Sequence, residues 1–236
     1  MQPTLMLLPG LMCDAAVWEP QVAALKDVAR CMVPAWGVRD TLAAMARQVL
    51  DEAPTERFGM AGHSMGGRVA LEVMRLAPQR VERLALLDTG THPLPAGEAG
   101  AKERAGRLAL LELARTQGMR AMGRQWARSM VHPSQQGTPL FESILDMIER
   151  GNPDQFAAQI NALLTRPDAA ALLPAIQCPT LVLCGREDAW SPPAQHETIR
   201  KAIPNASLRI VERCGHMCTM EQPQALSDAL AVWLQC

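Results

Sequence analysis

Hydrophobic residues along this chain gather in short runs that are separated by longer mixed stretches. Continuous apolar runs are typical of strands that are buried on both faces of a sheet. They occur at residues 4–8, 30–33, 58–62, 81–88, 180–185 and 207–211. The stretches between them predict helices, for example over residues 18–29, 41–53, 68–76 and 223–234. Strands and helices in alternation predict an α/β fold with a mostly parallel, doubly wound sheet.

The alternation stops in the middle of the chain. Between Thr91 and Pro174, the residues Pro93, Pro95 and Gly97 lead into helical stretches with no strand between them. This break divides the chain into a core, residues 1–92 and 172–236, and an inserted helical segment, residues 93–171.

Length and composition favour one domain with a sizeable core. The chain has 236 residues, of which 48% are hydrophobic, and single α/β domains reach this size. A net charge of −1 argues against general nucleic-acid binding. No apolar run approaches the ~20 residues that span a bilayer, so no membrane association is expected. The apolar start of the chain has no basic flank and stops at Pro9-Gly10, which predicts a first strand and not a signal peptide.

The cysteines indicate a reducing compartment. Seven cysteines without regular spacing suit the free thiols of a cytoplasmic protein. Cys214, His216 and Cys218 lie close together, but their spacing is not a usual zinc pattern and no second pair completes it. We therefore expect a cytoplasmic protein without a bound metal.

The run from Gly62 to Gly67, Gly-His-Ser-Met-Gly-Gly, joins an apolar strand to a helix. A serine between two glycines at a strand-to-helix turn is the pattern of a nucleophile elbow. The turn is so tight that the residues two before and two after Ser64 need almost no side chain, and Gly62 and Gly66 meet this need. The serine hydroxyl would then stand at a helix N-terminus, which favours negative charge. Ser64 is thus a candidate nucleophile, or else only a turn residue.

A nucleophilic serine needs a base. Of the five histidines, His216 follows the strand at 207–211 and precedes the last helix, so it can reach the elbow from the end of a strand. Its alternative roles are to cap that helix or to bond a buried carbonyl. His63 is adjacent to Ser64, and neighbours on a sharp turn point apart, so we expect His63 to pack or to form hydrogen bonds.

The base in turn needs an orienting acid. Asp188 lies just past the strand at 180–185, and serine, aspartate and histidine then follow the chain order Ser64, Asp188, His216. Its rival is Asp88, which ends the strand at 81–88 and could otherwise form the turn before Thr89-Gly90. Glu187 is one residue closer to its strand and should face the other way.

These motifs together resemble the α/β-hydrolase fold family. The resemblance spans residues 4–234 apart from the middle segment, and it rests on Pro9-Gly10-Leu11, the run around Ser64, residues 179–183 with Gly185 to Asp188, and Gly215-His216. It implies Ser64 as nucleophile, His216 as general base and then acid, and Asp188 as the orienting carboxylate. It also implies an oxyanion hole made by the backbone N–H groups of Leu11 and Met65.

The resemblance further implies that residues 93–171 form a helical cap over the active site, inserted after the sixth strand region. Two features depart from the family. The loop after the first strand commonly begins His-Gly in relatives and here reads Pro9-Gly10, and the segment at 33–37 is shorter than the glycine-rich loop expected there.

The predicted activity is that of a serine hydrolase of the esterase type. It would cleave a small to medium carboxylic ester or thioester through an acyl-enzyme, without a cofactor. The same fold and triad serve carbon–carbon bond hydrolases, cofactor-free haloperoxidases and lyases, which are the alternatives. A hypothesis from another class is a receptor-like ligand-binding protein or a degenerate hydrolase.

The predicted cap carries an apolar stripe made by Met119, Met122, Trp126 and Met130, which share one side of a helix. Methionine adapts to irregular shapes, so this stripe could line a pocket for an acyl or alkyl group. It could equally pack the cap onto the core.

The cap also carries a basic stretch. Between Ala101 and Met130 there are seven basic residues against two acidic ones. Arg120, Arg124 and Arg128 recur every four residues and so share one helical face, turned away from the apolar stripe. This face could simply be solvated, or it could bind the phosphates of coenzyme A or the acidic surface of an acyl carrier protein.

Overall fold

The protein is described by a computed structural model that covers residues 2–235. Its centre is a six-stranded sheet in the order β2-β1-β3-β4-β5-β6, in which every neighbouring pair is parallel. The strands are β1 Thr4–Leu8, β2 Arg30–Met32, β3 Phe58–His63, β4 Val81–Leu87, β5 Thr180–Gly185 and β6 Ala206–Val211. The predicted α/β class and parallel sheet are therefore confirmed.

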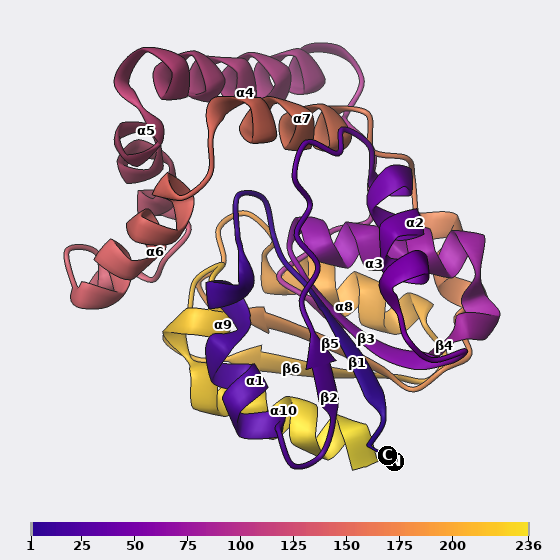
Figure 1. Cartoon of the computed structure of the whole chain (residues 1–236). Helices are drawn as coiled ribbons and strands as arrows, with labels where there is room; N and C mark the ends of the chain where they lie inside the picture. Colours follow the sequence, from indigo (N-terminus) through magenta and orange to yellow (C-terminus); the bar gives the residue numbers. More distant parts are fainter. Residues whose placement is uncertain (1, 236) are drawn as a thin grey trace.

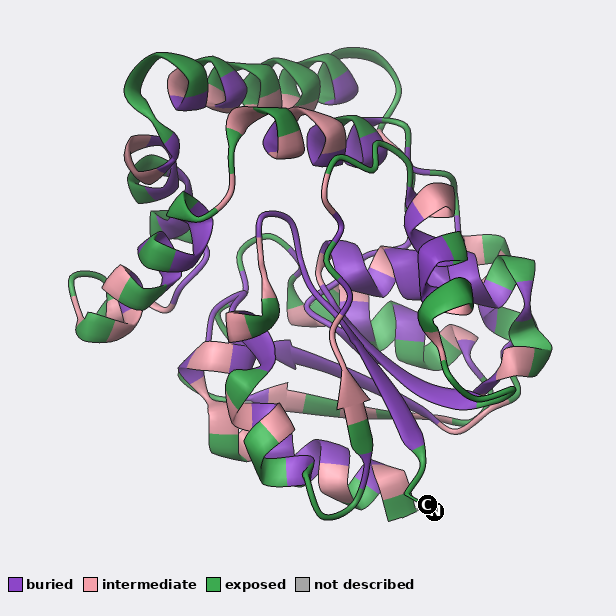
Figure 2. Ribbon diagram, in the orientation of Figure 1, coloured by how far each residue is buried: buried purple, intermediate pink, exposed green. Residues whose placement is uncertain are grey.

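Helices cover both faces of the sheet (Figure 1). On one face lie α2 Leu42–Glu52, α3 Met65–Leu76 and α8 Pro193–Ala202, and on the other lie α1 Glu19–Leu25, α9 Cys218–Glu221 and α10 Pro223–Gln235. The middle strands β1, β3 and β5 are buried at every residue, because helices cover them from both sides (Figure 2). This explains why these strands are continuous apolar runs.

The first predicted helix, residues 18–29, is shorter than expected. A 3-10 turn, Ala15–Trp18, precedes α1, and α1 ends at Leu25. The N–H groups of Val28 and Ala29 both donate to the Leu25 carbonyl, which turns the chain directly into β2. The next predicted helix agrees closely, because the Thr41 hydroxyl accepts a hydrogen bond from the Ala44 N–H and caps α2.

Four α-helices form an insertion above the carboxyl ends of the strands (Figure 1). They are α4 Gly97–Gln117, α5 Met119–Trp126, α6 Pro139–Glu149 and α7 Pro153–Leu164, and we call them the cap. The cap follows β4, the fourth strand of the chain, and not a sixth strand. The reason is that β5 and β6 come after the cap and complete the sheet at its far edge.

The register of the sheet fixes where its functional edge lies. Leu8 pairs with Gly62, His63 with Leu87, and Leu87 with Leu183, so these strands end side by side beneath the cap. In the part of the chain that is described, no helix combines the length and the apolar character that crossing a bilayer requires.

Candidate active site

Ser64 lies at the sharp turn between β3 and α3. It has a φ of 55° and a ψ of −115°, which is unusual for a residue with a side chain. The turn requires glycine at both flanks: a Cβ at Gly62 would lie 2.4 Å from the Gly66 carbonyl oxygen, and one at Gly66 would lie 2.1 Å from the Leu8 carbonyl oxygen. The Ser64 N–H donates to the Leu87 carbonyl at 2.8 Å, which ties the turn to β4.

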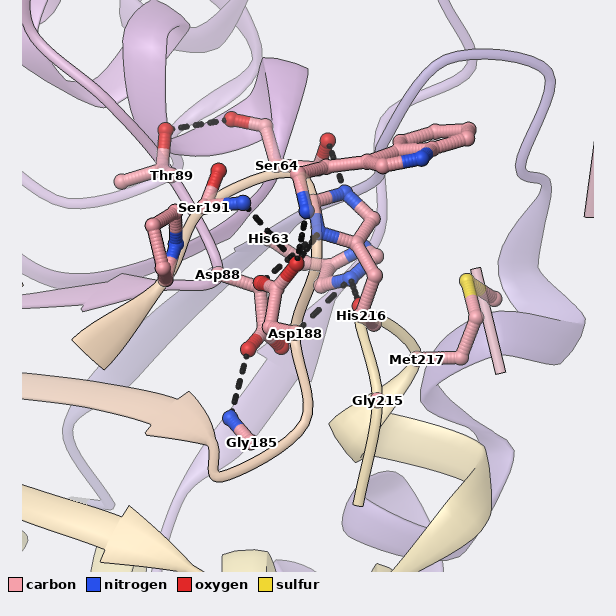
Figure 3. A network of polar contacts seen from close by, with 12 residues as sticks. His63, Ser64, Asp88, Thr89, Gly185, Asp188, Ser191, Gly215, His216 and Met217 are labelled. Carbon is pink, nitrogen blue, oxygen red and sulfur yellow. Dashed lines mark hydrogen bonds and ion pairs between the residues drawn. The ribbon is translucent and has the colours of Figure 1, made fainter. Parts of the chain in front are cut away.

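Three side chains from different parts of the chain meet at this turn (Figure 3). His216 Nε2 lies 2.8 Å from Ser64 Oγ, and His216 Nδ1 lies 3.0 and 2.9 Å from the two oxygens of Asp188. Asp188 Oδ1 also accepts hydrogen bonds from the N–H groups of Trp190 and Ser191, each at 2.9 Å. The order hydroxyl, imidazole, carboxylate is the geometry of a nucleophile, a base and an orienting acid.

The surroundings of His216 and Asp188 favour the charged pair. Burial alone lowers the pKa of His216, but the charge and hydrogen bond of Asp188 outweigh it, so the pKa is raised above its usual 6.5. Burial raises the pKa of Asp188. The charge and hydrogen bond of His216, together with the two N–H donors, lower it by more than burial raises it, so the net shift is downward. Asp188 therefore stays ionised and stabilises a protonated His216.

Asp88, the rival acid, is directed elsewhere. Its Oδ1 accepts a hydrogen bond from the Gly185 N–H at 3.0 Å, and its Oδ2 lies 3.7 Å from His63 Nε2. It is fully buried, and burial and then the neighbouring charge of Asp188 raise its pKa well above the usual value. Asp88 makes no contact with the His216 ring nitrogens among the described hydrogen bonds.

His63 packs behind the site. Its Nε2 donates a hydrogen bond of 2.7 Å to the carbonyl oxygen of His216, and the two rings are 5.4 Å apart. Burial, and then the charge of His216, lower the pKa of His63 to about 4, so it is neutral at physiological pH. Glu187 faces away from His216, because its Oε2 accepts the Cys214 N–H at 2.9 Å.

The two backbone N–H groups expected to form an oxyanion hole flank the serine. Neither the Leu11 N–H nor the Met65 N–H donates to another residue between 2 and 235. Gly10 packs against the elbow, since a Cβ there would lie 3.3 Å from Ser64 Cβ. Although the loop begins Pro9-Gly10 and not His-Gly, it still passes close to the serine.

The loop that carries His216 is fastened by Glu221. The buried Glu221 carboxylate accepts the N–H groups of Gly215 and Met217, and also that of His132 from the segment that follows α5. The His216 N–H donates to the Met130 carbonyl of the same segment. The base loop and the cap are therefore joined by hydrogen bonds from both sides.

An aromatic wall closes the site from above. The Trp190 ring lies 5.0 Å from the His216 ring and 5.6 Å from the Trp126 ring, and Phe156 extends the cluster. A small cavity of about 50 Å³ beside Ser64 opens under this wall, and a larger one of about 640 Å³ lies between the wall and α4. Trp190 was missed in the sequence, where its only signal is its position two residues after Asp188.

The predicted apolar stripe serves two purposes. Trp126 and Met130 border the small cavity beside Ser64. Met119 and Met122 border neither this cavity nor the larger one and are buried in the hydrophobic core. The stripe thus contributes half of its residues to the cavity wall and half to packing.

The expected basic face on α5 is not free. Arg120 forms ion pairs with Glu142, Asp146 and Glu149 of α6, and Arg124 Nη2 lies 3.9 Å from Glu142. Arg128 is exposed. These acidic residues lie outside the basic stretch between Ala101 and Met130. Residues 93–171 as a whole carry nine basic and eight acidic residues, so the basic stretch does not make the whole cap basic.

Within residues 2–235, no group of three or more histidine, cysteine, aspartate or glutamate side chains is arranged to hold a metal ion. Cys214 and Cys218 are buried, and burial raises the pKa of both thiols. They are therefore neutral packing residues beside His216. Cys236 lies outside the described residues.

Comparison with known proteins gives a consistent result. The 2-hydroxy-6-oxononadienedioate/2-hydroxy-6-oxononatrienedioate hydrolase of Cupriavidus pinatubonensis is 28% identical, over 98% of this chain and 86% of that protein. The pimeloyl-[acyl-carrier protein] methyl ester esterase of Nitrosomonas europaea is 26% identical, over 94% of this chain and 92% of that protein. Among solved structures, a malate-bound thermophilic esterase from Thermogutta terrifontis matches with a TM-score of 0.87 and 28% identity, over 100% of this chain and 90% of that one. The model of the Alpha/beta hydrolase family matches residues 5–229, and with nearly the whole chain covered, this protein belongs to the alpha/beta hydrolase family of enzymes.

Proposed function

We propose that the protein is a serine hydrolase that cleaves a small to medium carboxylic ester or thioester through an acyl-enzyme. The observation that carries the proposal is the 2.8 Å contact between His216 Nε2 and Ser64 Oγ, with Asp188 on the opposite ring nitrogen. In this arrangement Nδ1 carries the proton that Asp188 accepts. Nε2 is then free to take the proton of the serine hydroxyl.

The reaction proceeds in two halves. Ser64 Oγ attacks the substrate carbonyl while His216 takes its proton, and the resulting oxyanion is stabilised by the N–H groups of Leu11 and Met65. Each such donor typically lowers the barrier by ~3 kcal/mol. His216 then protonates the leaving group, and in the second half it activates a water molecule that releases the acid from Ser64.

The relatives support an ester as the substrate class. One relative is named as a methyl ester esterase. A second candidate, cleavage of a carbon–carbon bond, is favoured by another relative, because a 2-hydroxy-6-oxo dienedioate contains no ester bond for its hydrolase to cleave. The same serine, base and oxyanion hole can serve both reactions.

The proposal is tested by labelling with a fluorophosphonate and by turnover of p-nitrophenyl acetate. We expect rapid covalent labelling at Ser64, located by peptide mass spectrometry, and many turnovers per protein molecule. Ser64→Ala should lose both while its unfolding transition is unchanged, and Ser143→Ala, an exposed serine on α6, should keep both. Residual turnover of Ser64→Ala within about tenfold of the parent would remove Ser64 from the mechanism.

Two outcomes separate the alternatives. Labelling of Ser64 without repeated turnover would indicate a receptor-like or degenerate protein. Turnover of a 2-hydroxy-6-oxo dienoate at a higher kcat/KM than any ester or thioester of similar size would indicate a carbon–carbon bond hydrolase.

A further inference from the structure

A third cavity, of about 290 Å³, borders Ser64 and His216 but not Leu11. In contrast to the aromatic wall, part of the lining of this cavity consists of charged side chains. Four charged side chains stand there: Arg68 of α3, Glu103 and Arg107 of α4, and Arg166, which follows α7. The cavity wall thus carries three guanidinium groups and two acidic groups, those of Glu103 and Asp88.

Arg166 and Glu103 are explained by structure alone. Arg166 Nη1 and Nη2 hold the two oxygens of Glu103 at 2.8 and 2.9 Å, and its other donors bond the carbonyls of His92, Pro93 and Leu163. This pair joins α4 to the segment after α7, and Arg166 also bonds the segment after β4. It therefore needs no ligand.

Arg107 uses only part of its hydrogen-bonding capacity. Its Nε and Nη2 both lie 3.0 Å from the same Glu103 oxygen, and that carboxylate is already bonded by Arg166. Among the described contacts, Nη1 of Arg107 has no acceptor. Arg107 also borders the small cavity beside Ser64, together with His216.

Arg68 has no acidic partner within the described residues. Its Nη1 donates to the His92 carbonyl at 2.9 Å, an oxygen that also accepts from Arg166. The carboxyl group of Asp88 is turned to Gly185 and His63, and Asp188 is occupied by His216, Trp190 and Ser191. Burial, and then the positive charges of Arg166 and Arg107, lower the pKa of Arg68 to about 9, so it remains charged near pH 7.

Arg68 lies one helical turn after the serine. The Arg68 N–H donates to the Ser64 carbonyl at 3.4 Å, and both residues border the same cavity. A group held by Arg68 and Nη1 of Arg107 would therefore belong to the same small molecule whose carbonyl is attacked by Ser64. Two guanidinium groups with donors to spare match the flat, two-oxygen shape of a carboxylate.

We propose that this cavity is a carboxylate-binding subsite, and that the substrate is a monoester or monothioester of a short dicarboxylic acid. The inference rests on the proposed function for the identity of the reacting bond. The free carboxylate is held by Arg68 and Arg107 while the ester carbonyl lies at Ser64. A neutral ester of the same size leaves these two cations without a counter-ion and binds less well.

Binding is measured first, in a protein that cannot turn over. The Ser64→Ala variant is titrated calorimetrically with monomethyl glutarate and, as the neutral analogue, dimethyl glutarate. We expect the monoester to bind about 10- to 100-fold more tightly, which is the range for charge-assisted hydrogen bonds. Adding Arg68→Gln should abolish this preference, whereas Arg209→Gln, an exposed arginine on β6, should leave it unchanged. Equal affinity for the two ligands, or no measurable binding of either, would overturn the subsite.

Kinetics then connect the subsite to the reaction. In the active protein, the ratio of kcat/KM for monomethyl over dimethyl glutarate is followed by proton release in a pH-stat. We expect Arg68→Gln to lower this ratio about 10- to 100-fold and added salt to lower it in the parent, while Arg209→Gln keeps it. A ratio that Arg68→Gln does not change overturns the assignment, provided the variant unfolds at the parent's temperature. If the variant is destabilised, Arg107→Gln, which removes the other cation, replaces it in both experiments. If the carboxylate preference is found in Ser64→Ala but the parent hydrolyses neither ester, the proposed activity fails and the subsite stands.

Discussion

Replacing Asp188 with asparagine tests how the acid orients the base. Asp188 Oδ1 accepts two backbone N–H groups, those of Trp190 and Ser191, each at 2.9 Å. In the variant the amide oxygen must occupy this position, because an NH₂ group there would face two donors. The NH₂ group is then placed where Oδ2 stands, 2.9 Å from His216 Nδ1.

That placement reverses the proton on the imidazole. A donating NH₂ group requires Nδ1 to be unprotonated, so the proton moves to Nε2. Nε2 can then no longer accept the proton of Ser64, which lies 2.8 Å away. Forcing the wrong tautomer costs on the order of 10⁴ in kcat, which corresponds to about 5.5 kcal/mol of barrier.

The assay compares Asp188→Asn with Asp88→Asn. Asp88 does not contact the His216 ring nitrogens, which face Asp188 and Ser64, and an amide oxygen can still accept the Gly185 N–H, so Asp88→Asn should cost less than about tenfold. Both variants are measured for kcat/KM with p-nitrophenyl acetate and for urea unfolding, which separates lost chemistry from lost structure. A larger loss of kcat/KM for Asp88→Asn than for Asp188→Asn would refute the assignment of the acid.

Three further predictions concern pH and packing. Because His216 must be neutral to act as a base and its pKa is raised, kcat/KM should fall as pH decreases through a value above 6.5; a flat profile from pH 5 to 9 contradicts this role. His63 has a lowered pKa of about 4, so between pH 6.5 and 4 its imidazole is protonated in the unfolded chain but neutral in the folded protein. The difference in unfolding free energy between the parent and His63→Gln, measured by urea unfolding, should therefore shift against the parent by roughly 2 kcal/mol between pH 7 and 5. An unchanged difference would show that His63 is not buried in its neutral form. Gly66→Ala should destabilise by at least about 2 kcal/mol because its Cβ would meet the Leu8 backbone, whereas Gly106→Ala on α4, where nothing lies within 4 Å, should stabilise by about 0.5–1 kcal/mol; similar unfolding midpoints for the two variants would contradict the steric argument.

The features that could be read from the sequence are local ones. The turn at Ser64 needs two glycines within five residues, and the apolar strands on either side of the helices are visible as continuous runs. The first helix is shorter than its sequence predicts, because the turn after Leu25 depends on backbone hydrogen bonds and not on side-chain type.

The features that could not be read depend on packing between distant elements. Asp88 and Asp188 both follow strands, and these strands are neighbours in the sheet, so position along the chain does not decide which carboxylate meets His216. The partners of Arg120 lie on α6, and only the packing of α5 against α6 reveals them. Arg68 directly follows the run that contains Ser64, yet its lack of an acidic partner depends on how the surrounding elements pack.

The Glu221 carboxylate couples the position of the cap to the position of His216. It fixes the loop of His216 and the segment after α5 to one another, and Met130 of that segment borders the cavity beside Ser64. A substrate that fits poorly and displaces Met130 therefore also displaces the imidazole from the serine. Selectivity of this kind lowers kcat and not only binding, so poor substrates should show a low kcat even when they saturate the enzyme.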